Sequence, residues 1–232
     1  KIKIKFCISP IYDIQGYFMI KNSWMNSTDF YTSIFSKFPK NERPQIKTDS
    51  NSKQSEQTLI RDFTRNKYKI NRPIILQKMK KIENAWKKKN EKIFKLADNI
   101  FNDYKVINKT YTAFPSIWPI YLRNTNSNQI SFPYNKGTKH AIFVLSHEIL
   151  HILFYDYVYK KFKKLRPTIA SEAVWSFSEV LNVLIQNEKK WFQLTGLRAR
   201  PYPQHKELYK KMSAIWKKNH NIDDLITKFL GE

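Results

Sequence analysis

The segment AIFVLSHEILHILFY, residues 141–155, decides how this chain folds. Apolar residues occupy most sides of this segment when it is drawn as a helix, so it predicts a buried helix over about 139–161. Three ionisable side chains, His147, Glu148 and His151, interrupt the apolar run. Burying an ionisable group is costly unless the group is paired or binds a metal. The three side chains therefore need a chemical partner inside the protein.

The spacing of these side chains is that of a metal site. His147 and His151 are four residues apart, so their imidazoles project from one face of a helix and can bind one zinc ion at about 2.0–2.1 Å. Glu148 then lies beside the ion, where it can accept a proton from a zinc-bound water with a pKa of about 7. An accidental match would need a solvated helix, and this one is apolar on most sides. The pattern predicts one catalytic Zn²⁺ with Glu148 as the general base.

A catalytic zinc ion usually has three protein ligands and one water, so a third ligand must come from elsewhere. The HEILH pattern does not continue to a third histidine, because Phe154 and Tyr157 stand where Gly and His would be needed. A second apolar helix is predicted over 171–186, with Glu172 and Glu179 seven residues apart on one face. The helix dipole explains a carboxylate at Glu172, whereas Glu179 lies mid-helix among apolar residues. We favour Glu179 as the ligand and keep Glu172 as the alternative.

HEILH and a downstream glutamate together resemble the gluzincin group of zincin metallopeptidases. The resemblance covers residues 109–186 and is specific only at 147–151. It implies an upper lobe with a twisted sheet and two helices, a mostly helical lower lobe that supplies the third ligand, and an edge strand that binds extended substrate, here 129–133. The spacing in the thermolysin-like and aminopeptidase branches is nearer to that of Glu172. The Asp-bearing glutamate motif of the thermolysin-like branch and the Gly-rich exopeptidase motif of the aminopeptidases are both absent, which leaves endopeptidase and exopeptidase modes open.

Patterns elsewhere predict an α+β fold of the zincin-like kind. Residues 1–6 alternate lysine with apolar side chains, as a half-buried strand does, and 109–134 predict two or three short strands, the last at about 129–133. A long amphipathic helix is predicted to begin at Pro73, with an apolar stripe and a lysine-rich outer face. The stripe comprises Ile75, Met79, Ile82, Trp86, Ile93, Ala97 and Ile100. The polar residues 37–57 predict a surface loop.

These elements predict two lobes. An N-terminal lobe, 1–162, contains a small twisted sheet, a backing helix and the HEILH helix. A mostly helical C-terminal lobe, 163–232, supplies the third zinc ligand and ends in a helix over about 207–218. The irregular stretch before that last helix contains His205, which is the best candidate to stabilise an oxyanion, with Tyr202 and Arg198 ranking behind it. The alternative for His205 is an exposed histidine in a loop.

The charge balance is strongly positive, with 42 Lys and Arg against 19 Asp and Glu, for a net charge of +23. That excess suggests acidic partners, including nucleic acid. It consists mostly of lysine on predicted solvated faces, and abundant Asn and Ile with only 4 Gly are typical of a compositionally biased genome. The second hypothesis is therefore a basic nucleic-acid-associated protein with structural zinc. The third is a degenerate zincin that binds without turnover.

The single cysteine, Cys7, excludes a disulfide within the chain and a cysteine-based metal site. The first ten residues lack the apolar stretch of a secretory signal, and we find no membrane-spanning run of about 18–20 apolar residues. We therefore expect a cytoplasmic protein without a membrane span. The favoured function is a zinc metallopeptidase that acts on a peptide or protein substrate, with its oligomeric state left open.

Overall fold

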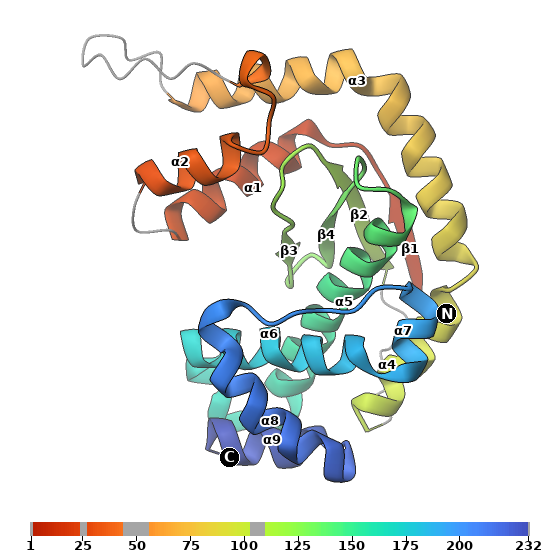
Figure 1. Ribbon diagram of the computed structural model, residues 1–232, viewed down its shortest axis with the longest axis vertical. Helices are drawn as coiled ribbons and strands as arrows, with labels where there is room; N and C mark the ends of the chain where they lie inside the picture. Colours follow the sequence, from red (N-terminus) through yellow and green to blue (C-terminus); the bar gives the residue numbers. More distant parts are fainter. Residues whose placement is uncertain (1, 24–26, 44–55, 103–109, 232) are drawn as a thin grey trace.

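The computed structural model describes residues 2–23, 27–43, 56–102 and 110–231. Helices surround a small four-stranded sheet, so the predicted combination of a small sheet with many helices is confirmed (Figure 1). The strands are β1 (Lys3–Phe6), β2 (Thr110–Ser116), β3 (Arg123–Asn124) and β4 (Gln129–Pro133). Both predicted strand regions form strands, and one face of β1 is more buried than the other, as the alternation predicts.

The order of the strands is β1-β2-β4-β3. β2 pairs in parallel with β1 and with β4, whereas β3 is antiparallel to β4. The expectation that 129–133 is the edge strand is therefore wrong, because β4 is interior and β3 is the edge. The cause is the turn at 125–128, where the side chain of Asn124 accepts hydrogen bonds from the backbone N–H groups of Asn126 and Ser127 and folds the chain back.

The first helices are α1 (Pro10–Ser23) and α2 (Ser27–Phe35). They pack with the first half of α3 and with Trp118 around a second apolar core. Gly16 permits this packing, because a Cβ at that position would lie 1.9 Å from the Leu122 side chain. Leu122 immediately precedes β3, so α1 fixes the chain that enters the edge strand.

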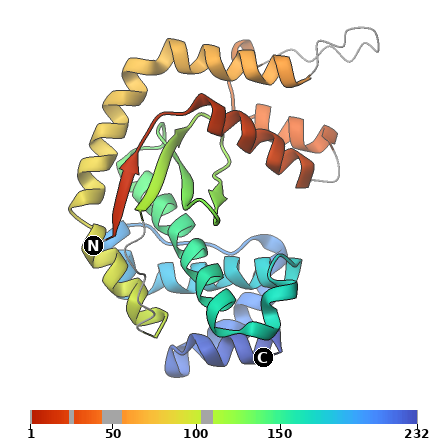
Figure 2. The same ribbon diagram turned by 180° about the vertical axis from the view of Figure 1, so that it is seen from behind.

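The long helix α3 extends over Glu56–Lys87, and α4 over Asn90–Ile100. The prediction that a helix begins at Pro73 is wrong, since Pro73 lies inside α3. Buried residues before it, such as Ile60 and Tyr68, continue the helical stripe towards the N-terminus. Figures 1 and 2 show a bent α3 that arches around the β1 side of the sheet, and an interior proline is a usual cause of such a bend. Of the predicted loop 37–57, residues 44–55 lie outside the described ones.

Helix α5 (Thr138–Lys161) forms where the sequence predicts it, and it packs against β4 of the sheet (Figure 1). Helix α6 (Glu172–Asn187) also forms where predicted, with Ser171 as its N-cap. The chain continues through α7 (Lys189–Thr195), α8 (Lys206–Asn219) and α9 (Ile222–Leu230). α8 matches the predicted closing helix, whereas α7 and α9 were not predicted from sequence patterns.

The main apolar core contains side chains from both sides of the predicted division at 162/163, including Trp86, Leu150, Leu181 and Leu225. The two predicted lobes therefore share one apolar core. Their division at 162/163 stays a prediction about which part of the chain supplies which part of the site. By length and composition, α5 is the one described helix that could cross a membrane. However, 78% of its most apolar stretch is buried inside the protein. That burial is typical of a central core helix.

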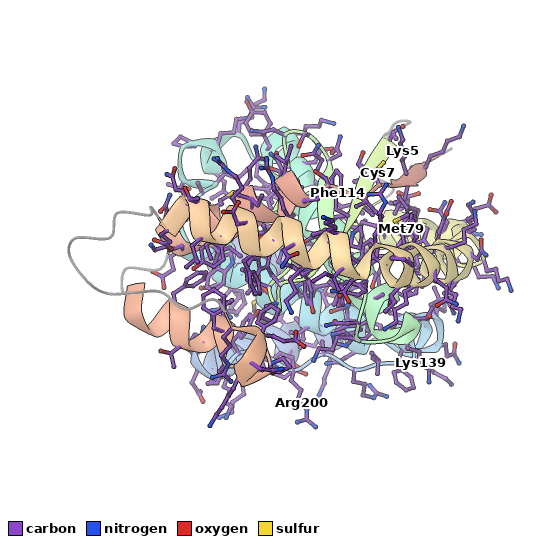
Figure 3. All side chains as sticks on the ribbon, turned by 90° about the horizontal axis from the view of Figure 1, so that it is seen from above. Lys5, Cys7, Met79, Phe114, Lys139 and Arg200 are labelled. Carbon is purple, nitrogen blue, oxygen red and sulfur yellow. The ribbon has the colours of Figure 1, made fainter. Side chains whose placement is uncertain are left out.

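Basic side chains are spread over the outside of the protein. In the view of Figure 3, nitrogen-tipped side chains project around the whole outline, with Lys5 and Arg200 at opposite sides of it. The lysines of α3 and α4 are largely exposed, as their predicted place opposite the apolar stripe requires. Over the described residues, the view gives no single face to which the positive charge is confined.

Candidate metal centre

Three side chains from α5 and α6 meet at one point. His147 and His151 lie one turn apart on α5, and Glu179 faces them from the middle of α6. The Nε2 atom of His147 is 3.4 Å from one carboxylate oxygen of Glu179, and the Nε2 atom of His151 is 3.2 Å from the other. The two Nε2 atoms are 3.0 Å apart. Among the described residues, these three form the group that could hold a metal ion.

The distances between these atoms fit a tetrahedral ion. Two ligand atoms that each lie about 2.0–2.1 Å from such an ion are roughly 3.3–3.4 Å apart. The two Nε2 atoms are 3.0 Å apart, and each lies 3.2–3.4 Å from a different carboxylate oxygen of Glu179, so these separations are close to that value. One ligand atom from each of the three residues lies within 4.8 Å of the others, which is a grouping that could hold a metal ion.

Gln186 fixes the tautomer of His147. Its amide Nε2 donates to the carbonyl oxygen of Phe143 at 3.1 Å, and a carbonyl can only accept, so the amide orientation is determined. The amide oxygen of Gln186 then faces Nδ1 of His147 at 2.9 Å. Nδ1 must carry the proton, which leaves Nε2 with a free lone pair pointing towards Glu179 and His151. This is the tautomer that a metal ligand requires.

The electrostatics of the three side chains are also suited to a cation. Burial, with a contribution from Arg123, lowers the pKa of His151 to about 3, so this imidazole is neutral and can act as a ligand. Burial would raise the pKa of Glu179, but the two histidines outweigh burial and lower it, which keeps the carboxylate ionised. Burial would lower the pKa of His147, but Glu179, Glu148 and Gln186 together raise it. The groups that favour a positive charge on His147 would favour a metal cation at the same place.

The two candidate glutamates are separated by the structure. Glu179 is 6% exposed and lies against the histidines, and Asn182, one turn further on, donates to the backbone carbonyl of His147 at 3.0 Å. Glu172 is exposed at the first turn of α6, roughly 10 Å along the helix axis from Glu179. The alternative that Glu172 belongs to the cluster is therefore wrong: a shared helix face does not bring two turns of helix to one ion.

Glu148 is buried beside the cluster and pairs with an arginine that the sequence did not indicate. Its carboxylate lies 3.4 Å from Nη1 of Arg123, and Nη2 of the same arginine lies 3.9 Å from Glu179. Burial raises the pKa of Glu148, and Arg123 partly offsets that effect. Arg123 belongs to the edge strand β3. The sequence held one signal for this residue. Arg123 lies in a region predicted to form strands, and a buried arginine requires an acidic partner.

The segment between α7 and α8 packs against α6, the helix that carries Glu179. Ala199 and Asn187 exchange two hydrogen bonds, which attach this segment to the end of α6. Arg198 is held there too, by the backbone carbonyl of Asn187. His205 is 4% exposed, so the alternative of an exposed loop histidine is wrong. It packs against Trp175 of α6 at 5.1 Å between ring centroids, one turn before Glu179.

Two tyrosine hydroxyls are close enough to sense the acidic groups. Burial, together with the charges of Glu179 and Glu148, raises the pKa of Tyr202 to about 12. Burial and the charge of Glu148 likewise raise the pKa of Tyr12 on α1. The Tyr12 hydroxyl is buried and has no hydrogen-bond partner among the described residues. Both phenols therefore stay neutral at ordinary pH, and their electrostatic coupling relates Tyr202 to both acids and Tyr12 to Glu148.

No protein-family model matches this chain, and no curated protein or solved structure resembles it significantly. The chemistry of the site itself is therefore the basis for a functional assignment.

Proposed function

We propose that this protein is a zinc-dependent hydrolase, and specifically a metallopeptidase, in which His147, His151 and Glu179 hold the metal. The observation that supports the proposal most directly is the close grouping of two imidazole nitrogens, 3.0 Å apart, with a carboxylate whose two oxygens lie 3.2 and 3.4 Å from them. The tautomer of one of these histidines is fixed by Gln186. Two imidazoles with one carboxylate, and a position left for water, is the donor set of many catalytic zinc sites.

A bound zinc ion supplies Lewis acidity, which polarises a carbonyl and makes a water molecule acidic at neutral pH. Glu148 follows the first ligand directly and is 5% exposed, so its carboxylate has few competing water contacts. It accepts the proton of the attacking water and later delivers it to the leaving amine. His205 and Tyr202, on the wall that packs against α6, are the side chains proposed to stabilise the oxyanion.

The sheet supports a peptide as the substrate. Within the described part of the chain, β3 pairs with β4 on one side and with no strand on the other, and it carries Arg123 beside Glu148. An extended peptide can pair with the open side of an edge strand through backbone hydrogen bonds. In this proposal β3, and not 129–133, takes the substrate-binding role that the gluzincin resemblance implies. The proposed architecture is zincin-like, with the sheet above α5 and the helical part below it.

Metal content tests the proposal. Purified wild-type protein, reconstituted with zinc and desalted, is expected to hold one equivalent by elemental analysis. His147→Ala and Glu179→Gln should each lose the metal, because two remaining ligands bind zinc weakly. Glu172→Gln is the matched control on the same helix and should keep it. Failure of the wild-type protein to retain zinc, or loss of zinc only with Glu172→Gln, would refute the proposed site.

A further inference from the structure

Metal binding alone does not explain why Arg123 lies in this site. Its guanidinium contacts both acids of the site, at 3.4 Å from Glu148 and 3.9 Å from Glu179. The side chain also lies over the ring of Tyr155, at 5.8 Å from the ring centroid. Both acid contacts are longer than the roughly 2.7–2.9 Å of a strong charge-assisted hydrogen bond. Arg123 therefore lies near both acids without forming a strong charge-assisted hydrogen bond to either one.

The charges of the site change sign when the metal binds. Glu148 and Glu179 contribute two negative charges and Arg123 one positive charge, while the ligand histidines are neutral when they bind a metal. A divalent cation brings the total from about −1 to about +1 by formal count. Glu179 then directs its charge at the metal, so Arg123 loses the weaker of its two partners. A buried site with an unbalanced positive charge favours an anionic ligand.

The position of Arg123 suits a ligand that approaches along the sheet edge. The residue begins β3, which pairs with β4 alone among the described strands, and its side chain remains 18% exposed beside the buried acids. A guanidinium offers five N–H donors in a planar fork that matches a carboxylate. A peptide lying along β3 would thus bring its own carboxylate within reach of the fork.

We propose that Arg123 is a specificity-determining residue that binds a carboxylate of the substrate next to the scissile bond. The inference rests on the proposed zinc site. The carboxylate comes either from an acidic side chain or from the C-terminus of a peptide, which present the same group to the fork. Pairing restores the charge balance that the metal removes, and it positions the neighbouring carbonyl near Glu148.

Two hydroxamates test this role without requiring turnover. Succinic monohydroxamate and its terminal amide share the metal-binding group and differ only in a carboxylate. Calorimetry on the zinc-loaded wild type is expected to show roughly tenfold or greater preference for the carboxylate. Arg123→Gln should reduce that ratio to about one, and Arg123→Lys, which keeps the charge but not the fork, should retain part of it. Arg65→Gln, an exposed charge on α3, should leave the ratio unchanged.

The outcomes separate the two proposals. A zinc-loaded protein that binds both compounds equally, or whose ratio survives Arg123→Gln, overturns the role of Arg123 alone. Protein that holds no zinc overturns the proposed function and the role with it. A purely structural Arg123 would weaken both compounds equally, which also counts against the role. Thermal melting of each variant checks folding, and Arg123→Lys keeps the test open if Arg123→Gln does not fold.

The source of the carboxylate can be resolved by digesting one peptide pool in free-acid and C-terminally amidated forms. Cleavage near the end of free-acid peptides only assigns the C-terminal carboxylate, and cleavage beside Asp or Glu in both forms assigns the side chain. Cleavage that ignores both carboxylates contradicts the inference while leaving the hydrolase intact.

Discussion

The fold contains two buried clusters of polar groups, one closed and one open. In the first, Asp13 of α1 accepts hydrogen bonds from the Tyr68 hydroxyl at 2.8 Å and from the backbone N–H of Ile117 at 2.9 Å. In the second, the metal ligands and Glu148 face one another, His147 remains 20% exposed, and Nδ1 of His151 has no partner among the described residues. Satisfied buried groups support structure, whereas an accessible group of acceptors needs a ligand. The difference suggests a structural role for the Asp13 cluster and a chemical one for the His147 cluster.

Replacing Glu148 should give the largest effect and the cleanest separation of chemistry from binding. Glu148→Gln keeps the size of the side chain and removes its ability to accept a proton. We expect peptide hydrolysis to fall by roughly 10²–10⁴-fold, the usual contribution of a general base, with zinc content and melting temperature nearly unchanged. Parallel assays of turnover and bound zinc would check this. Full activity in the variant would remove Glu148 from the mechanism.

Asp13→Ala should damage the other cluster and leave the metal in place. The substitution leaves the Ile117 N–H without its acceptor, and it removes one hydrogen bond from the Tyr68 hydroxyl, which keeps the Pro115 carbonyl as a partner. An unsatisfied buried group costs about 1–3 kcal/mol and a lost hydrogen bond about 0.5–1.5 kcal/mol, so a loss of roughly 2–4 kcal/mol in the free energy of unfolding is expected. Urea denaturation measures the loss, and elemental analysis of the folded fraction should still find zinc. Loss of zinc with unchanged stability would reverse the roles assigned to the clusters.

Asp13 should also make the free energy of unfolding depend on pH. Burial, partly offset by hydrogen bonds from Ile117, Ser116 and Tyr68, raises the pKa of Asp13 to about 6 from its ordinary 3.8. The folded protein therefore binds more protons than the unfolded chain between these values, so this contribution to stability is present at low pH and is lost as the pH rises from about 4 to about 6. A protonated carboxyl also lets Asp13 donate to Tyr68, whose hydroxyl contacts the carbonyl of Pro115.

Asp13→Asn places a neutral oxygen at the same position and isolates this contribution. The difference in stability between wild type and variant should change by up to about 3 kcal/mol over that pH range, since one pKa unit corresponds to about 1.36 kcal/mol. Denaturation curves at several pH values would measure it. A difference that stays constant with pH would mean that Asp13 titrates normally in the folded protein.

The open cluster was largely predictable from the sequence because its signal is local. His147 and His151 share a helix face by spacing alone, and the burial of Glu179 follows from its apolar neighbours. The same local patterns predicted α5, α6, α8 and the strand regions. Helix geometry explains why Glu172 was the weaker alternative. The seven-residue spacing of Glu172 and Glu179 separates the two carboxylates by about 10 Å along the helix axis, so only one of them can reach the histidines.

The closed cluster and Arg123 could not be found this way, because their partners are far apart in sequence. Asp13 meets Tyr68 and Ile117 only after α1 and α3 pack together. Arg123 meets Glu148 only because β3 turns back along β4 as the edge strand. Pro73 misled the prediction in a related way, since a proline that usually begins a helix lies within one here. Tertiary packing decides these cases, and no spacing in the sequence records it.

Replacing Gln186 should give the smallest effect. The substitution tests whether a residue outside the proposed ligand set contributes to metal affinity. Gln186 contacts the metal ligand His147 and the backbone of α5 but lies outside the proposed ligand set. Gln186→Leu preserves the volume and removes the acceptor that holds the proton on Nδ1 of His147. Outer hydrogen bonds of this kind usually change metal affinity by 10–100-fold, so zinc should bind roughly that much more weakly in a chelator competition. Gln193→Leu, on an exposed position of α7, should bind zinc as the wild type does. Equal zinc affinity in all three proteins would mean that His147 selects its tautomer without help, and that the metal geometry depends on the ligands alone.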